Sequence, residues 1–380
     1  MMATRREFLK LTAAAPGVTA IGGVASLWPR PGPLLSARQR IQAFCIDFNW
    51  VRGGFAPPGH WAAADPKAHV DWYGALGANV IQTFAVSCNG YAWYQKGRVP
   101  PQPGLQHNFL PEVVELAHQR GMLAMGYFCV GANSRWGASH PTLSYGTPSN
   151  VHIPFTDQYL DFLTQSLTDA MKKTRMDGTM LDWVWNPAEK LRTQGWLPAE
   201  QRLYTQLTGK TFPASGTPGA EDKLEYERKA IDRCWARIKA ARDQANPRCV
   251  LWLSVNNLSQ PSIKDSPMLR QVDWLMNESP DPNLYALGRH LAGAKTRMIQ
   301  NEVGWPTHDA RKFLSDPRHR DLDLYGFAEP EENSLPLPIE EYLRRPVEAF
   351  KPQERRSANN YNIAALARFY RGMPMEAVLP

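Results

Sequence analysis

The sequence has 380 residues, of which 43% are hydrophobic and 21% are charged. This balance is that of an ordinary globular protein and excludes an intrinsically disordered chain. The formal net charge is +7, but the basic residues form no long Lys/Arg runs, which argues against a nucleic-acid-binding protein. A mild positive excess still permits an anionic partner such as a sulfated or uronic-acid glycan.

The first 37 residues are predicted to be an export signal. Arg5 and Arg6 precede an apolar run of small residues over 11–27, a pattern that resembles a twin-arginine signal. This run is too short and too rich in Gly, Ala and Pro to span a bilayer, and no later run is apolar enough for a membrane helix. We therefore expect residues 1–37 to direct export to the periplasm or the medium, and residues 38–380 to form a single domain.

The cysteines and histidines give no sign of a metal site. The five cysteines are odd in number and show no CxxC spacing: Cys45, Cys88, Cys129, Cys234 and Cys249. The histidines form neither an HExxH nor an HxH pattern. We therefore expect buried free thiols, with one or two disulfides as the alternative that export would allow, and we expect no metal or other cofactor.

From residue 44 onward, short apolar runs alternate with amphipathic stretches. The apolar runs predict strands over 44–50, 79–86, 123–128, 179–185, 249–255, 272–276, 296–300 and 322–327. The amphipathic stretches predict helices over 68–78, 110–120, 156–174, 222–245, 284–293, 309–314 and 360–371. Eight strands that alternate with helices indicate an α/β fold, a (β/α)8 TIM barrel with enlarged βα loops. An open doubly wound sheet is the alternative, but no Gly-rich phosphate loop follows the first strand.

Two long segments interrupt the alternation. The segment between residues 186 and 221 is rich in Pro and Gly and is predicted to be an insertion after the fourth strand. The Pro-rich segment over 329–352 is predicted to be a surface loop after the eighth strand.

Polar and aromatic residues gather where the predicted strands end. In a TIM barrel these ends and the loops after them build the active site. The candidates for binding a ligand there are Asp47, Asn49, Trp50, Asn89, Tyr91, Trp93, Trp136, Trp183, Asn256, Glu302 and Glu329. Burying several carboxylates among apolar strands without partners would be costly, which favours a polar, ligand-filled mouth. Trp50, Trp136 and Trp183 are candidates for stacking on sugar rings.

Two carboxyl groups that face each other across a barrel mouth are typical of the catalytic site of a glycoside hydrolase. One carboxyl group protonates the leaving oxygen, and the other attacks the anomeric carbon or activates water. Asp182, in the fourth predicted strand, is the first candidate. Glu278 is our choice for its partner, with Glu302 and Glu329 as alternatives, and the spacing that separates retaining from inverting chemistry cannot be read from the sequence.

Several motifs over residues 44–187 resemble glycoside hydrolase family 29, the α-L-fucosidases. Residues 88–94, Cys-Asn-Gly-Tyr-Ala-Trp-Tyr, are similar to the family's second-strand motif of two histidines followed by Asp-Gly-Phe, one residue and Leu-Trp. Residues 120–122, Arg-Gly-Met, look like the entry to its third strand. Residues 176–183, Met-Asp-Gly-Thr-Met-Leu-Asp-Trp, resemble the strand that ends in its aspartate nucleophile. The resemblance implies that Asp182 attacks the anomeric carbon in a retaining mechanism.

The chain departs from this family at the residues that hold fucose. Ser87 and Cys88 stand where the family has its histidine pair, and Asn89 replaces the Asp that follows. We therefore expect a hydrolase of a fucose-containing or related, possibly sulfated, oligo- or polysaccharide. A galactosidase-like hydrolase, a noncatalytic glycan-binding barrel, and an isomerase or metal-dependent hydrolase on the same fold remain the alternatives. The oligomeric state is left open.

Overall fold

The computed structural model describes residues 39–380 apart from 52–53, 148, 280, 304–307, 331–333 and 351–354. The predicted export signal lies outside the described residues, and the division of the chain at residue 37 stays a prediction. Among the helices of the described residues, none is both long and apolar enough to span a bilayer.

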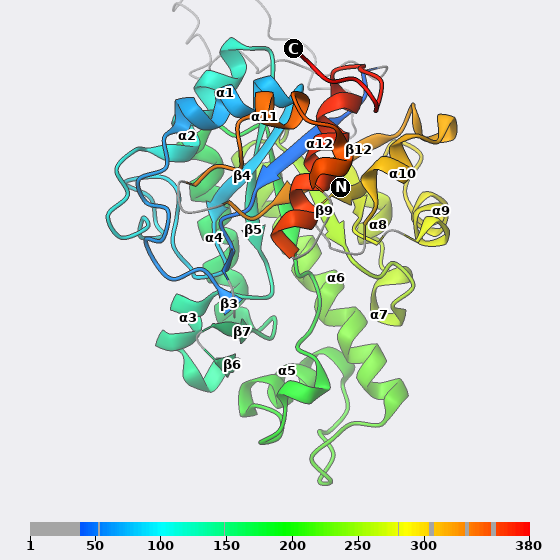
Figure 1. Ribbon diagram of the computed structural model, residues 1–380. Helices are drawn as coiled ribbons and strands as arrows, with labels where there is room; N and C mark the ends of the chain where they lie inside the picture. The colour runs from blue at the N-terminus through cyan, green and yellow to red at the C-terminus, as the bar shows by residue number, and fades with distance from the viewer. Residues whose placement is uncertain are drawn as a thin grey trace, which may run out of the picture. The chain divides into compact units, whose positions relative to one another are not determined.

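Eight parallel strands close into a barrel (Figure 1). In chain order they are β1 (Gln42–Ile46), β4 (Val80–Val86), β5 (Leu123–Cys129), β8 (Gly178–Asp182), β9 (Val250–Val255), β10 (Trp274–Asn277), β11 (Arg297–Val303) and β12 (Asp323–Ala328). Each strand pairs with the next, and β1 pairs with both β4 and β12, which closes the ring. The predicted TIM barrel is confirmed, and the alternative of an open sheet is wrong.

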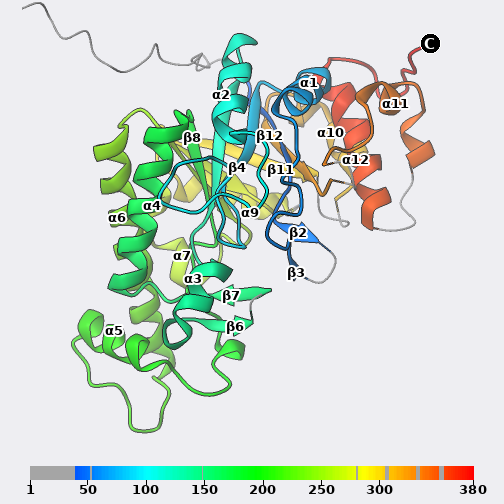
Figure 2. The ribbon, with the colours of Figure 1, turned by 90° about the vertical axis from the view of Figure 1, so that its left-hand side faces the viewer.

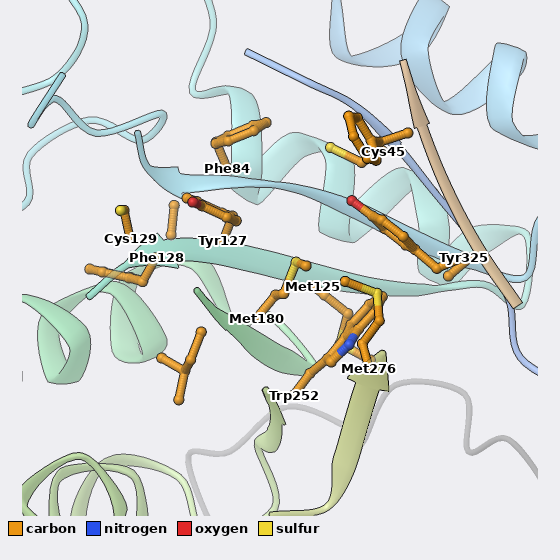
Figure 3. Close-up of a cluster of buried hydrophobic side chains, with 14 of the residues drawn as sticks. Cys45, Phe84, Met125, Tyr127, Phe128, Cys129, Met180, Trp252, Met276 and Tyr325 are labelled. Atoms are coloured by element: carbon orange, nitrogen blue, oxygen red, sulfur yellow. The ribbon is translucent and has the colours of Figure 1, made fainter. Parts of the chain in front are cut away.

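The barrel interior is a packed core, rich in methionine and aromatic side chains. Figure 3 shows Met125, Met180, Trp252, Met276 and Tyr325 gathered inside the ring of strands, and all five are buried. Side chains alternate between the two faces of a strand, so every second residue of each strand points into this core. The same alternation decides which residues reach the mouth at the C-terminal ends of the strands.

Helices surround the barrel, and capping residues mark the two ends of the first of them. The helices are α1 (Pro66–Leu76), α2 (Phe109–Gln119), α4 (Asp157–Thr174), α6 (Ala220–Ala245), α7 (Pro261–Lys264), α8 (Met268–Gln271), α9 (Pro282–Leu291), α10 (Ala310–Leu314) and α12 (Arg355–Tyr370). The Asp65 side chain accepts the Ala68 N–H and caps the start of α1. Gly77 ends that helix in the left-handed conformation, at φ 91°.

Three enlarged loops follow the C-terminal ends of barrel strands. The loop after β1 forms the hairpin β2 (Trp50–Val51) and β3 (Gly54–Phe55). The loop after β5 contains α3 (Ser134–Ser139) and the hairpin β6 (Tyr145–Thr147) and β7 (Asn150–His152). The insertion after β8 contains α5 (Pro198–Thr208). Figures 1 and 2 show α3, β6, β7 and α5 together at the lower end of the barrel.

The prediction of a surface loop over 329–352 is wrong for its second half. That part contains α11 (Ile339–Leu343) and a 3-10 turn, Val347–Phe350. Its apolar side chains, Ile339, Tyr342, Leu343, Val347 and Phe350, are buried. Pro residues at the start of a short helix do not prevent it, since the first helical N–H groups have no partner within the helix.

A buried ion pair fixes the insertion after β8. Arg192 and Glu200 are almost fully buried, and Arg192 Nη2 donates to Glu200 Oε1 at 2.8 Å. The Tyr145 hydroxyl donates to Glu200 Oε2 at 2.5 Å, and the Tyr226 hydroxyl donates to Oε1 at 3.0 Å. These contacts connect the insertion to the β6–β7 hairpin and to α6.

Replacing Glu200 with Ala is expected to lower the free energy of unfolding by about 3–5 kcal/mol, because Arg192 would keep a buried charge without its main partner. Urea denaturation of the two proteins measures the difference. Glu221→Ala, at the exposed start of α6, is the matched control. Equal stability of the Glu200 and Glu221 variants would contradict the assignment.

Candidate active site

Asp182 is the last residue of β8 and lies on the same strand face as Met180, so it continues the interior face to the mouth. Its carboxyl group is held at both oxygens. The Tyr127 hydroxyl donates to Oδ2 at 2.8 Å, and the Trp183 backbone N–H donates to Oδ1 at 2.8 Å. Both donors stabilise the ionised form of the carboxyl group.

Glu278 follows β10 and continues the face of Met276 in the same way. Its backbone N–H donates to the Val255 carbonyl oxygen at 3.1 Å, and the Ser254 hydroxyl donates to its Oε1. Only β9 lies between the strands of Asp182 and Glu278. Neighbouring strands are ~4.8 Å apart, so the two backbones lie about 10 Å apart and their inward side chains converge across that gap.

Asp47 adds a third carboxyl group at this mouth. It follows β1, its backbone N–H donates to the Ala328 carbonyl oxygen at 2.8 Å, and its Oδ1 accepts the Asn49 N–H at 2.7 Å. The negative charges of both Asp182 and Asp47 act on the Glu278 carboxyl group. The structure therefore brings together three of the residues that the sequence singled out.

The two principal carboxyl groups differ in how strongly they hold a proton. Burial raises the pKa of Asp182 from 3.8 to about 6, against the lowering effect of its two hydrogen bonds. Burial and the nearby charge of Asp182 raise the pKa of Glu278 to about 8. Near neutral pH, Asp182 is thus mostly ionised and Glu278 mostly protonated, which is the division of roles that acid and nucleophile require.

Tyr127 and Ser254 belong to the site, although we did not select them from the sequence. Both lie on the interior face of their strands: Tyr127 is paired with Met180, and Ser254 with Met276. Strand alternation counted from the candidate acids identifies both positions. Asn256, which we selected beyond the fifth strand, lies two residues after Ser254 and is exposed.

Replacing Tyr127 with Phe is expected to reduce kcat/KM by about 10-fold to 100-fold, because one of the two hydrogen bonds that keep Asp182 ionised and oriented is lost. The pKa of Asp182 should rise further, so the acid limb of the pH profile moves to higher pH. The ring still packs against Phe84, whose centroid is 5.0 Å away. An unchanged acid limb would show that the hydroxyl does not act on Asp182.

Aromatic rings from three loops stand beside Asp182. Trp183 packs against Trp50 of β2, with ring centroids 6.1 Å apart, and against His152 of β7 at 5.0 Å. Trp50, His152 and Trp183 are all half-buried. Burial lowers the pKa of His152 to about 4, so this ring is neutral in the physiological range. The surface that these rings present is uncharged and aromatic, which suits the apolar faces of sugar rings.

Four other selected residues hold the loops rather than line the mouth. Asn49 Oδ1 accepts the Cys88 N–H, and the Asn89 amide donates to the Ala56 carbonyl oxygen. Trp93 is buried against Phe48, with centroids 4.5 Å apart, and its indole N–H donates to Ser87. Trp136 is buried in α3, where it stacks on His140 at 4.1 Å.

The remaining candidates lie at various depths around the barrel. Glu302 is only 2% exposed, and burial raises its pKa to about 8. It follows Asn301 at a break in the β11–β12 register. Glu329 is half-buried after β12, and Tyr91 is half-buried with the Arg135 guanidinium 5.9 Å from its ring centroid.

All five cysteines are free and buried. Within the described part of the chain, no group of three or more His, Cys, Asp or Glu side chains is arranged to hold a metal ion.

No protein-family model and no curated protein sequence matches the chain. Solved structures do match it. The α-L-fucosidase isoenzyme 2 from Paenibacillus thiaminolyticus has a TM-score of 0.59 at 14% identity, over 88% of this chain and 49% of the fucosidase chain. The PgaB (BpsB) glycoside hydrolase domain from Bordetella bronchiseptica has a TM-score of 0.55 at 12% identity, over 77% of this chain and 94% of that domain.

The chain therefore shares its barrel fold with these glycoside hydrolases, and it spans about half the length of the fucosidase. At such low identity the likeness concerns the fold alone.

Proposed function

We propose that this protein is a retaining glycoside hydrolase with Asp182 as nucleophile and Glu278 as general acid/base. One observation carries the proposal: two carboxyl groups lie on either side of β9 at the barrel mouth, and their pKa values are separated. The group with two hydrogen-bond donors is mostly ionised at pH 7, and the other is mostly protonated. When the surroundings of two acids separate their pKa values in this way, the acid with the lower pKa serves as the nucleophile and the one with the higher pKa as the general acid.

The reaction uses this protonation state directly. Asp182 attacks the anomeric carbon, the glycosidic C–O bond breaks, and the leaving oxygen takes the proton of Glu278. A covalent ester then joins the sugar to Asp182. In the second step Glu278, now ionised, takes a proton from a water molecule, whose oxygen attacks the anomeric carbon and releases Asp182. Both protonation states are restored at the end of the cycle.

A fucose-containing or related glycan is the proposed substrate. The motifs over 44–187 and the fold shared with an α-L-fucosidase support it. At the positions of the family's histidine pair, however, Ser87 accepts a hydrogen bond from Trp93, and Cys88 is fully buried. Sugar hydroxyls must therefore be bound by other groups, and the carboxyl groups of Asp47, Asp182 and Glu278 are candidates.

The proposal is tested by screening the purified protein against aryl glycosides and fucose- and galactose-containing polysaccharides, sulfated and unsulfated. Release of new reducing ends is expected from at least one of them, and NMR of the first-formed product reports whether the anomeric configuration is retained. Binding without release across the panel would favour a noncatalytic glycan-binding barrel, and inversion would assign Asp182 to activation of water.

We further propose that the protein acts outside the cytoplasm, because its first 37 residues resemble a twin-arginine signal. Fractionation of cells that express the full chain is expected to recover it from the periplasm or the medium. Recovery from the cytoplasm alone would overturn this proposal.

A further inference from the structure

The backbone at Trp183 adopts a conformation that is unusual for a tryptophan. Its φ is +58°, in the left-handed region that favours glycine and disfavours bulky side chains. This turn ends β8 directly after Asp182. The Trp183 N–H, at the start of this turn, donates to Asp182 Oδ1 at 2.8 Å. Strained backbone persists where the surroundings hold it in place, and such places concentrate at functional sites.

Four rings surround the Trp183 side chain. His152 and Trp185 stack on it, with centroids 5.0 Å and 5.5 Å away and interplanar angles of 24° and 29°. Phe55 and Trp50 pack at 5.7 Å and 6.1 Å with tilted planes. The rings come from the loops after β1, β5 and β8. Rings from three loops therefore pack against one side chain.

The backbone on either side of Trp183 is fixed as well, by the loop after β5. The Val130 N–H donates to the Asp182 carbonyl oxygen at 2.8 Å. Gly131 lies so close that a Cβ atom added to it would be 2.5 Å from the Trp183 carbonyl oxygen. Only a glycine allows this approach, so the left-handed turn and the glycine opposite it fit each other.

We propose that Trp183 is a positioning residue: its packed ring, together with Gly131, holds the peptide between Asp182 and Trp183 in place, so that the Trp183 N–H stays on the Asp182 carboxyl group. This inference rests on the proposed role of Asp182 as nucleophile. The carboxylate then presents a fixed oxygen to the anomeric carbon, and a displacement of about 1 Å can slow such a reaction about 100-fold. Without the ring, the turn has no reason to keep a conformation that the backbone disfavours.

A residue that only stabilised the fold would leave the ionisation of Asp182 unchanged. The other titratable groups facing this carboxyl group are Tyr127 and Cys129 of β5, Cys88 after β4, and Glu278 after β10. No substitution at Trp183 or Gly131 replaces any of these side chains. A rise in the pKa of Asp182 in these variants therefore reports the loss of the Trp183 N–H hydrogen bond, and not a change in the neighbouring titratable groups.

Three variants and one control test the proposal. Trp183→Ala removes the ring but keeps the Cβ atom that disfavours the left-handed backbone, so the turn loses the packing that holds it. Trp183→Phe restores a ring. Gly131→Ala leaves all five rings in place and displaces the turn. Gly219→Ala, at a position with no atom within 4 Å of the added Cβ, is the matched control.

Two measurements are made on each protein: kcat and KM on the best glycoside of the screen, and NMR titration of 13C-labelled aspartate, with Asp182 assigned by its absence in Asp182→Asn. We expect Trp183→Ala and Gly131→Ala to lower kcat by about 10-fold to 100-fold, to change KM less than about threefold, and to raise the pKa of Asp182. We expect Trp183→Phe to recover most of kcat, and Gly219→Ala to equal the wild type.

Folded Trp183→Ala and Gly131→Ala proteins with wild-type kcat and an unchanged Asp182 titration would overturn the proposal. If Trp183→Ala does not fold, Gly131→Ala decides alone. The titration needs no substrate, so a shifted pKa in a protein that hydrolyses nothing would support the positioning role and refute the proposed function. The opposite result, hydrolysis with an unshifted pKa, would refute only the positioning role.

Discussion

Asp182→Asn is expected to slow glycoside hydrolysis by about 10³-fold or more, because an amide cannot attack the anomeric carbon to form the glycosyl ester. The substitution keeps the size of the side chain, and Asn Oδ1 can still accept a hydrogen bond. Substrate binding is therefore expected to persist, which isothermal titration with the best glycoside of the screen measures. Initial rates of reducing-end release measure the loss of activity.

The stability of this variant separates loss of chemistry from loss of fold. Burial raises the pKa of Asp182 to about 6, so the folded protein binds this proton more tightly than the unfolded chain. Ionising the group therefore destabilises the fold increasingly as pH rises from about 4 to above 6. Asn removes that cost, so at pH 8 the variant is expected to unfold at no lower temperature than the wild type.

Asp161→Asn, the same change on the exposed face of α4, is the control and should match the wild type in both assays. Hydrolysis that survives in Asp182→Asn at the wild-type rate would remove Asp182 from the mechanism.

The fold could be read from the sequence because its signals are local and repeated. The helix predicted over 156–174 is α4, Asp157–Thr174, capped by Thr156. The strand predicted over 179–185 ends earlier, at Asp182. Trp183, Val184 and Trp185 are apolar and read as a continued strand, but the left-handed turn at Trp183 stops it. A tryptophan gives no sequence signal for that conformation, which is usually adopted by glycine or asparagine.

Strand alternation predicts which side chains reach the barrel mouth, whereas tertiary contacts decide where the other selected residues lie. Asp182 and Glu278 continue interior faces, and the same count leads to Tyr127 and Ser254. Asn89 and Trp93 also follow a strand, but Asn89 donates a hydrogen bond to a backbone carbonyl oxygen, and Trp93 packs against a ring of the core. Glu302 adjoins an irregular pairing in β11, so alternation does not fix its direction. Loop conformation and bulges depend on distant partners, which a single sequence does not reveal.

Glu278→Gln is expected to reduce kcat/KM by about 10²-fold to 10⁴-fold on substrates with a sugar leaving group, because that oxygen departs only when it is protonated. Aryl glycosides with acidic phenols need less protonation, so their first step should be affected far less.

The wild-type pH profile of kcat/KM is expected to be bell-shaped, with an acid limb near the Asp182 pKa of about 6 and an alkaline limb near the Glu278 pKa of about 8. Activity rises with pH as the Asp182 nucleophile ionises, and it falls again as the Glu278 acid loses its proton. Gln cannot titrate, so the alkaline limb should disappear while the acid limb remains. Glu115→Gln on the exposed face of α2 is the control for the substitution itself. If Glu302→Gln, rather than Glu278→Gln, shows the leaving-group dependence and the lost alkaline limb, the acid/base belongs to β11 and the pairing of Asp182 with Glu278 is wrong.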